Sequence, residues 1–106
     1  MDSYSVELLK TAEDDLDNLK HKRDEAVEKL RELEENPKEK SSALSGHDLP
    51  SLYCYSFNLK GSGSYRAIFD LIEENKVCLL LVIGPRENFY FKASRKIRDL
   101  KKKGLI

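Results

Sequence analysis

Residues 52–92 read LYCYSFNLKGSGSYRAIFDLIEENKVCLLLVIGPRENFYFK, and this pattern predicts four strands in succession. Leu52–Lys60 and Ser64–Ile72 alternate apolar and polar side chains, which is typical of strands buried on one face. Val77–Ile83 is an unbroken apolar run, as expected of a strand covered on both faces. Asn88–Lys92 resumes the pattern after a Gly-Pro break. Because short turns join these neighbours, we expect an antiparallel meander.

The segment before this stretch combines a short strand with a helical pattern. Ser3–Leu9 alternates weakly and predicts a first strand. Thr11 then fits the N-cap of a helix, with Asp14 three residues later in a capping-box pattern. Apolar residues follow at helical spacing as far as Leu33, and Asn36-Pro37 ends the pattern. No Gly or Pro interrupts it, so one long helix is favoured, with a kink or tight helical hairpin as the alternative.

The remaining segments are a polar connection and a short basic helix. Residues 38–51 form the connection, with Leu44 and Leu49 as expected anchors on the core. Ala93–Lys103 has few large apolar residues, so we expect a short helix that must dock on the sheet or on a partner. This order predicts an α+β fold, in which the N-terminal helical layer and the other helices lie against one face of a mainly antiparallel sheet. The other face is expected to stay partly open for a ligand.

Length and composition favour a single domain over residues 1–106. A chain of 106 residues is long enough to bury one core. No apolar run approaches the ~20 residues of a membrane span, and the N-terminus lacks the pattern of a secretory signal. Cys54 and Cys78 fall inside predicted strands, so we expect a reduced, buried pair and a cytoplasmic protein. Neither the cysteines nor the two histidines have metal-ligand spacing, so no metal is expected.

Charge is balanced overall but divided along the chain. Residues 1–50 carry 14 acidic and 8 basic side chains, a net charge of −6, whereas residues 51–106 carry 5 acidic and 11 basic ones, a net charge of +6. A positive half can bind a polyanion or an acidic protein partner. The alternative is that these Glu- and Lys-rich segments are simply well solvated.

Three side chains of the meander have chemistry that a strand does not require. Arg66 points away from its apolar neighbours on the second strand, Arg86 follows the buried strand, and Tyr90 lies on the expected last strand. If the strands pair in sequence, the three converge at one patch. Arginine offers a planar fork of donors that matches a phosphate, and tyrosine can donate, accept or stack on a base. The patch is therefore a candidate phosphodiester site, with scattered surface charges as the alternative.

The same motifs resemble those of the RelE/ParE superfamily of toxins from bacterial toxin–antitoxin pairs. Gly63-Ser64-Tyr65-Arg66-Ala67 resembles the family's Tyr-Arg-hydrophobic strand after a Gly/Ser turn. The apolar strand Val77–Ile83 and the ending Gly84-Pro85-Arg86 … Tyr90 follow in the family's order. The N-terminal strand and a helical layer ending in Asn36-Pro37 also match, so the resemblance covers nearly the whole chain.

The resemblance implies a ribosome-dependent endonuclease that cuts messenger RNA without a metal or cofactor. The family reaction is attack of a ribose 2′-hydroxyl on the adjacent phosphate. By matching position, Arg66 and Arg86 would bind the phosphate and stabilise its growing charge. Tyr90 would orient the nucleotide or take part in proton transfer. A cognate antitoxin is the implied partner, in a toxin–antitoxin hetero-oligomer.

The chain departs from the RelE-type pattern on its first meander strand. Ser56 and Asn58 stand where RelE-type toxins carry two lysines, and Lys60 can compensate only in part. Tyr90 and Lys60 are the candidate general bases, since no other is evident. Side chains expected to contact RNA are polar or basic and lie near strand ends or on the last helix: Lys60, Asn58, Lys92, Arg95 and Lys96.

Two alternative functions follow from these departures. A ParE-like toxin shares the fold and poisons DNA gyrase, and it needs neither the arginines nor the tyrosine. A catalytically inert relative would still bind the antitoxin, which is consistent with the lack of a clear general base.

Overall fold

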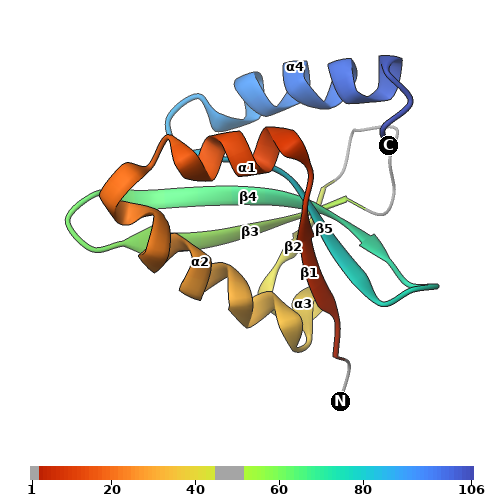
Figure 1. The fold of residues 1–106 in the computed structure, drawn as a ribbon, viewed down its shortest axis with the longest axis horizontal. Helices are drawn as coiled ribbons and strands as arrows, with labels where there is room; N and C mark the ends of the chain where they lie inside the picture. Colours follow the sequence, from red (N-terminus) through yellow and green to blue (C-terminus); the bar gives the residue numbers. More distant parts are fainter. Residues whose placement is uncertain (1–2, 45–51) are drawn as a thin grey trace.

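A five-stranded sheet forms the centre of the part that the computed structural model describes, residues 3–44 and 52–106. The strand order is β1-β5-β4-β3-β2 (Figure 1). All neighbouring strands pair antiparallel except β1 and β5, which are parallel. The strands are β1 (Ser5–Leu8), β2 (Ser42–Ala43), β3 (Leu52–Leu59), β4 (Gly63–Ile72) and β5 (Val77–Pro85). The predicted α+β fold with a mainly antiparallel sheet is therefore confirmed.

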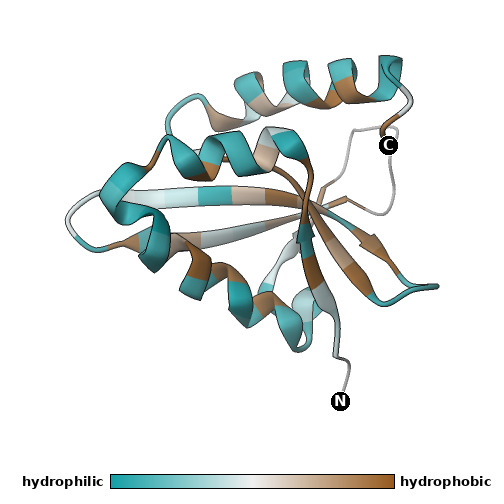
Figure 2. Cartoon of the chain, viewed as in Figure 1, coloured by the Kyte–Doolittle hydropathy of each residue, from teal (hydrophilic) through white to brown (hydrophobic). Residues whose placement is uncertain are grey.

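Helices cover both faces of this sheet (Figure 1). The helices α1 (Lys10–Asp17) and α2 (Arg23–Arg31) pack on one face, where the larger apolar cluster is centred on residues such as Leu16, Leu33 and Phe69. On the other face, α4 (Phe89–Lys102) packs over a second cluster. In Figure 2 the apolar residues concentrate on the strands and on the inward sides of the helices. The expectation that helices lie on one face only is therefore wrong, because the apolar stripe of α4 covers most of the second face. The polar end of that face stays exposed.

The expected single long helix is wrong, and the helical hairpin is the correct alternative. α1 ends at Asp17, and a short 3-10 turn η1 (Lys20–Lys22) leads into α2. Lys20 has a positive φ of 54°, which an α-helix does not allow. A further turn η2 (Glu32–Glu34) and the short helix α3 (Pro37–Lys40) complete this layer. Two short helices keep Ala12, Leu16, Ala26 and Leu30 against one sheet face, so tertiary packing overrides the unbroken local pattern.

The predicted fourth meander strand, Asn88–Lys92, is also wrong. The chain turns after β5 and enters α4, with Asn88 in the left-handed region at φ 55°. Phe89 begins a buried stripe at helical spacing that continues through Ala93, Ile97 and Leu100. The Phe-Tyr-Phe alternation suggested a strand, but Phe91 is 68% exposed while Phe89 is buried. The expected short C-terminal helix is confirmed and begins four residues earlier than predicted.

Side chains of α1 complete the hydrogen bonding along the edge of β5. β1 pairs with β5 as far as Leu80, and beyond that point the edge has no partner strand in the described residues. Thr11 Oγ1 donates to the carbonyl of Leu81 (2.7 Å), and Asp15 Oδ2 accepts from the N–H of Ile83 (2.9 Å). The predicted N-cap role of Thr11 is therefore wrong, because the N-cap residue of α1 is Leu9, two residues earlier.

Several smaller predictions have definite outcomes. Cys54 and Cys78 are free and buried, as expected. Leu44 packs against the second apolar cluster as a partly buried anchor, whereas Leu49 lies outside the described residues. Within residues 3–44 and 52–106, no helix is long and apolar enough to cross a membrane.

Candidate functional site

The candidate site is a row of residues across three neighbouring strands on the face that α4 covers. Arg66 of β4 lies in register with Ser56 of β3 and Gly84 of β5. The pairing shifts between Ile68 and Phe69, where β5 has one extra residue, a β-bulge. Paired residues on antiparallel strands point to the same face. Ser56 and Arg66 therefore share the face of the second apolar cluster, at its open polar end.

Arg66 and Tyr90 form the central contact of this site. An Nη1–H of Arg66 donates to the Tyr90 hydroxyl at 2.6 Å, and the Arg66 Cζ lies 5.2 Å from the centroid of the tyrosine ring. The same hydroxyl lies 3.7 Å from Cys54 Sγ on β3. The contact joins the first turn of α4 to two strands, while Tyr90 remains 44% exposed. A ligand can thus reach a guanidinium and a phenol that are already held together.

The electrostatic environment keeps Tyr90 protonated. Burial is the main cause that raises the pKa of Tyr90 above its ordinary value of 10.0, and the hydrogen bond to Cys54 adds to it, although Arg66 acts in the opposite direction. A phenol with a raised pKa is a weak base at neutral pH and retains a proton that it can donate. At neutral pH Tyr90 therefore carries its proton, which suits an orienting or proton-donating group better than a general base.

A polar rim continues from this pair toward the β3–β4 turn. Ser64 is in register with Asn58 on β3, and its Oγ donates to the Asn58 Oδ1 at 2.9 Å. Both side chains are exposed, as is Ser56. Hydroxyl and amide groups offer hydrogen bonds to a ribose or a phosphate without adding charge. The two positions where RelE-type toxins carry lysines thus form a neutral polar surface in this chain.

Arg86 lies at the same end of the sheet, two residues beyond Gly84. Its backbone N–H donates to the carbonyl of Ser64 at 3.0 Å, which fixes the loop between β5 and α4 against β4. The exposed Arg86 lines a hollow of about 410 Å³ together with Ser64 and residues of the β3–β4 turn. Within residues 3–44 and 52–106, its side chain makes no ion pair. A hydrogen bond between backbones thus brings the Arg86 loop to the site row. Among the described residues, the Arg86 side chain forms no hydrogen bond with Arg66 or Tyr90.

The remaining predicted RNA contacts occupy three different places. Lys60 is exposed at the end of β3, where its N–H donates to Glu25 Oε2 (2.9 Å) and its carbonyl accepts from Lys22 Nζ. Arg95 lies over the exposed ring of Phe91, with Cζ 6.0 Å from the centroid. These groups therefore surround the central pair instead of joining it.

Two lysines lie on the flank of α4 that faces α1. Lys92 and Lys96 line a hollow of about 350 Å³ between α4, β5 and α1. Lys96 Nζ also forms an ion pair with Asp15 Oδ1 at 2.7 Å. The structure thus places these two predicted contacts on a different flank of the helix from Tyr90.

Sequence reasoning missed Cys54 as part of the site. It was interpreted as a core residue, and it is 4% exposed, but its thiol also contacts the Tyr90 hydroxyl. No sequence signal could reveal this contact while Tyr90 was assigned to a strand. Within residues 3–44 and 52–106, no group of three or more His, Cys, Asp and Glu side chains is arranged to hold a metal ion.

Comparison with known protein families identifies the class of the chain. The model of the "ParE-like toxin of type II bacterial toxin-antitoxin system" family matches residues 6–94, which is most of the sequence and includes Arg66, Arg86 and Tyr90. The chain belongs to the ParE-like toxin family. Its membership of the RelE/ParE superfamily, expected from the Tyr65-Arg66 strand and the Gly84-Pro85-Arg86 ending, is confirmed. The comparison with curated protein sequences gave no match.

Solved structures similar to this ParE-like chain include RelE toxins. A mutant of the toxin RelE from E. coli in the free state is 26% identical, with a TM-score of 0.63, and the match covers 95% of this chain and 97% of that one. The toxin in the intact E. coli RelBE toxin–antitoxin complex is 27% identical (TM-score 0.60; 80% and 99% covered). The archaeal RelE–RelB complex from Pyrococcus horikoshii OT3 has 26% identity and a TM-score of 0.56, with 80% and 97% covered. Two of these three contain an antitoxin.

Proposed function

We propose that this ParE-like chain is a ribosome-dependent mRNA endonuclease that a cognate antitoxin holds inactive. The Arg66–Tyr90 contact carries the proposal, because it presents a fixed guanidinium beside a protonated phenol at the open end of the sheet. The RelE toxins among the similar structures support the RelE-type branch, and the antitoxin complexes among them support a partner of that kind.

The proposed reaction is an internal transesterification of RNA. A ribose 2′-oxygen attacks the adjacent phosphorus, and the bond from phosphorus to the 5′-oxygen of the next nucleotide breaks. The products are a 2′,3′-cyclic phosphate and a 5′-hydroxyl, so the 2′-hydroxyl loses a proton and the leaving oxygen gains one. In this scheme Arg66 stabilises the charge on the phosphate oxygens in the transition state, and Tyr90 donates the proton to the leaving oxygen.

In this proposal the ribosome and the toxin have different roles, because Ser56 and Asn58 supply no general base. A side chain that can accept the 2′-proton at neutral pH is missing from the described site row, because Tyr90 has a raised pKa. We therefore propose that the 2′-proton passes to water or to the RNA itself, and that the ribosome supplies the alignment of the 2′-oxygen. Alignment of this kind can contribute several kcal/mol to a barrier.

The test uses purified ribosomes paused on a defined message, with cuts mapped by primer extension. The wild type is expected to cut at the A-site codon, and Arg66→Gln to cut about 100-fold more slowly, the typical cost of one lost charge-stabilising donor. Arg31→Gln is the matched control, because Arg31 is an exposed arginine on α2, on the opposite face of the sheet. Equal cutting by wild type and Arg66→Gln, or no cut by a folded wild type, would contradict the proposal.

A ParE-like action on DNA gyrase is the second candidate, and the neutral Ser56–Asn58 surface favours it. It predicts that DNA synthesis stops before protein synthesis after induction in cells. The endonuclease predicts the reverse order, so pulse labelling of both polymers separates the two functions.

A further inference from the structure

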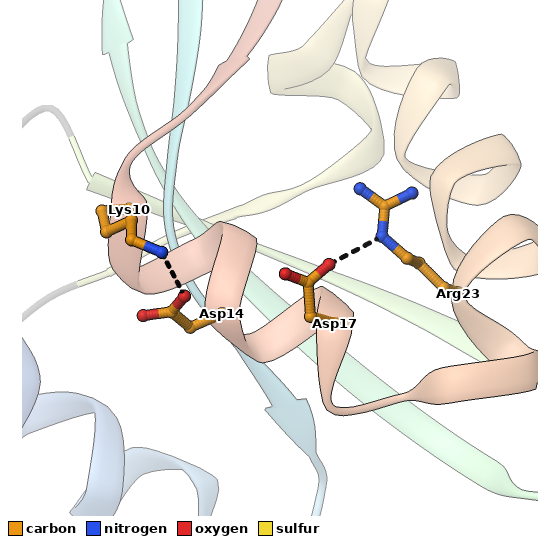
Figure 3. A network of polar contacts seen from close by, with 4 residues as sticks. All are labelled: Lys10, Asp14, Asp17 and Arg23. Atoms are coloured by element: carbon orange, nitrogen blue, oxygen red, sulfur yellow. Dashed lines mark hydrogen bonds and ion pairs between the residues drawn. The ribbon is translucent and has the colours of Figure 1, made fainter.

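The ion pair between Asp15 and Lys96 connects the α1–β5 edge to α4 at a distance from the proposed site. Asp15 Oδ2 accepts from the backbone N–H of Ile83, so this carboxylate is fixed to the sheet. Its other oxygen, Oδ1, binds Lys96 Nζ at 2.7 Å. The Asp15 side chain is 10% exposed, in contrast to its neighbours Asp14 and Asp17, which are 56% and 65% exposed. Those two pair with Lys10 and Arg23 at the surface (Figure 3).

Lys96 and Tyr90 lie on opposite flanks of the apolar stripe of α4. They are six residues apart, which places them about 120° apart around the helix and about 9 Å apart along its axis. The buried residues Phe89, Ala93 and Ile97 lie between them on the side that faces the sheet. Packing of this stripe on the sheet sets the rotation of the helix approximately. The two polar contacts, one on each flank, restrain it further.

Rotation of α4 directly determines where the Tyr90 hydroxyl lies. Side-chain tips lie about 5–6 Å from a helix axis, so a rotation of about 30° moves them by about 3 Å. That displacement exceeds what the 2.6 Å contact with Arg66 tolerates. A displacement of about 1 Å in a reacting group can already cost a factor of about 100 in rate.

We propose that Asp15 is a positioning residue, which acts through Lys96 to hold α4 in the rotation that places Tyr90 on Arg66. As a role in catalysis this rests on the proposed endonuclease, whereas the mechanical link between Asp15 and Tyr90 does not. It gives Lys96 a structural task in place of the RNA contact expected from the sequence. The two roles predict different values of kcat when the charge of Asp15 is removed.

The first test is kinetic and uses Asp15→Asn, which keeps an oxygen for Ile83 and removes the charge that binds Lys96. We expect kcat to fall about tenfold with KM unchanged, and Lys96→Met to show the same loss, with Lys96→Arg restoring the rate. In a Tyr90→Phe background, Asp15→Asn should have no further effect. Asp14→Asn, an exposed acid on the same helix, should behave as the wild type. If Lys96 binds RNA directly, Asp15→Asn leaves kcat intact, which overturns the proposal.

The second test measures the position of Tyr90 without any RNA. Tyr90 lies over the buried thiol of Cys54, whereas Cys78 lies in the other apolar cluster. In Asp15→Asn, a thiol reagent with peptide mapping should label Cys54 about tenfold faster, with Cys78 still protected. Labelling of Cys54 at the Asp14→Asn rate, or equal acceleration at both cysteines, overturns the proposal. If the wild type proves to cut no RNA, the proposed function fails while this labelling result still decides the link.

Discussion

The guanidinium of Arg66 donates a 2.6 Å hydrogen bond to the hydroxyl of Tyr90, and that hydroxyl lies 3.7 Å from Cys54 Sγ. One helical side chain thereby contacts two adjacent strands at the open end of the sheet. The site owes its geometry to the docking of α4 on the second apolar cluster. The proposed catalysis should therefore depend on the docking of α4.

Arg66 and Tyr90 should act as one unit. Each of the variants Arg66→Gln and Tyr90→Phe should slow single-turnover cutting by about 100-fold or more. Because each residue orients the other, the double variant should be no slower than the slower single variant. Cut rates on paused ribosomes measure this coupling. Rate losses that multiply in the double variant would show that the two residues act independently.

The Tyr90 phenol should stay protonated beyond the ordinary tyrosine pKa. Burial raises its pKa above 10.0, so the proton that the proposed reaction needs is present throughout the neutral range and is lost only as pH rises through the raised value. Ultraviolet absorbance of tyrosinate, compared between the wild type and Tyr90→Phe, reports this group. A tyrosine that ionises below pH 9 in the wild type and is missing from Tyr90→Phe would contradict the account.

Phe89 and Phe91 should differ sharply in their effect on stability. In a strand the two rings would share a face, but in α4 Phe89 is 3% exposed and Phe91 is 68% exposed. Phe89→Ala should cost about 3–5 kcal/mol in free energy of unfolding. Phe91→Ala should stay within about 0.5 kcal/mol of the wild type. Denaturant unfolding of the two variants checks this, and equal losses would argue for the strand.

Ionisation of the Cys78 thiol should lower the free energy of unfolding at alkaline pH. Burial, with a smaller contribution from Glu73, raises the pKa of this thiol to about 12 from its ordinary 9.0. Between these values the unfolded chain binds fewer protons than the folded one. The contribution of Cys78 to the free energy of unfolding is therefore fully present below pH 9 and decreases as pH rises toward 12. The slope from one such group is at most about 1.4 kcal/mol per pH unit.

The measurement for Cys78 is the free energy of unfolding as a function of pH in the wild type and in Cys78→Ala. The substitution lowers stability at neutral pH by removing a buried sulfur, so only the slope above pH 9 is compared. The slope should be shallower in the variant. Parallel curves would show that the thiol does not retain its proton in the folded state.

The sequence was informative where a local pattern and tertiary packing agree. Alternation in Leu52–Lys60 and Ser64–Ile72, and the apolar run of Val77–Ile83, predicted β3, β4 and β5 nearly to the residue. Alternation identifies the two half-buried strands, and the shortness of the apolar run between turn residues favours a fully buried strand over a helix.

Two errors arose where packing overrides local pattern. The helical stripe from Ala12 to Leu33 contains no Gly or Pro, yet Lys20 takes a positive φ because two short helices cover the sheet face better than one long helix. Phe89-Tyr90-Phe91 is too short to separate a period of two from a helical turn. The apolar residues Ala93 and Ile97, which continue from Phe89 at helical spacing, were the sequence signal for a helix.

The candidate site was partly predictable for the same reasons. The meander register brings Arg66 into the row with Ser56, and the Arg86 loop bonds to β4 as the order of strands suggested. Tyr90 reaches Arg66 from a helix, so the expected partner was right although its element was wrong. The Asp15–Lys96 pair joins residues 81 positions apart, so no local sequence pattern predicts it.

The central claim is that the chain cuts RNA by attack of a 2′-hydroxyl, and a message with one altered sugar tests it most directly. Ribosomes are paused on two otherwise identical messages, one of which carries a single 2′-deoxynucleotide at the position mapped as the cut. We predict that the all-ribose message is cut, leaving a 2′,3′-cyclic phosphate, and that the substituted message is not cut at that position. Cutting of the substituted message at the same position, or no cut in either one, would contradict the account.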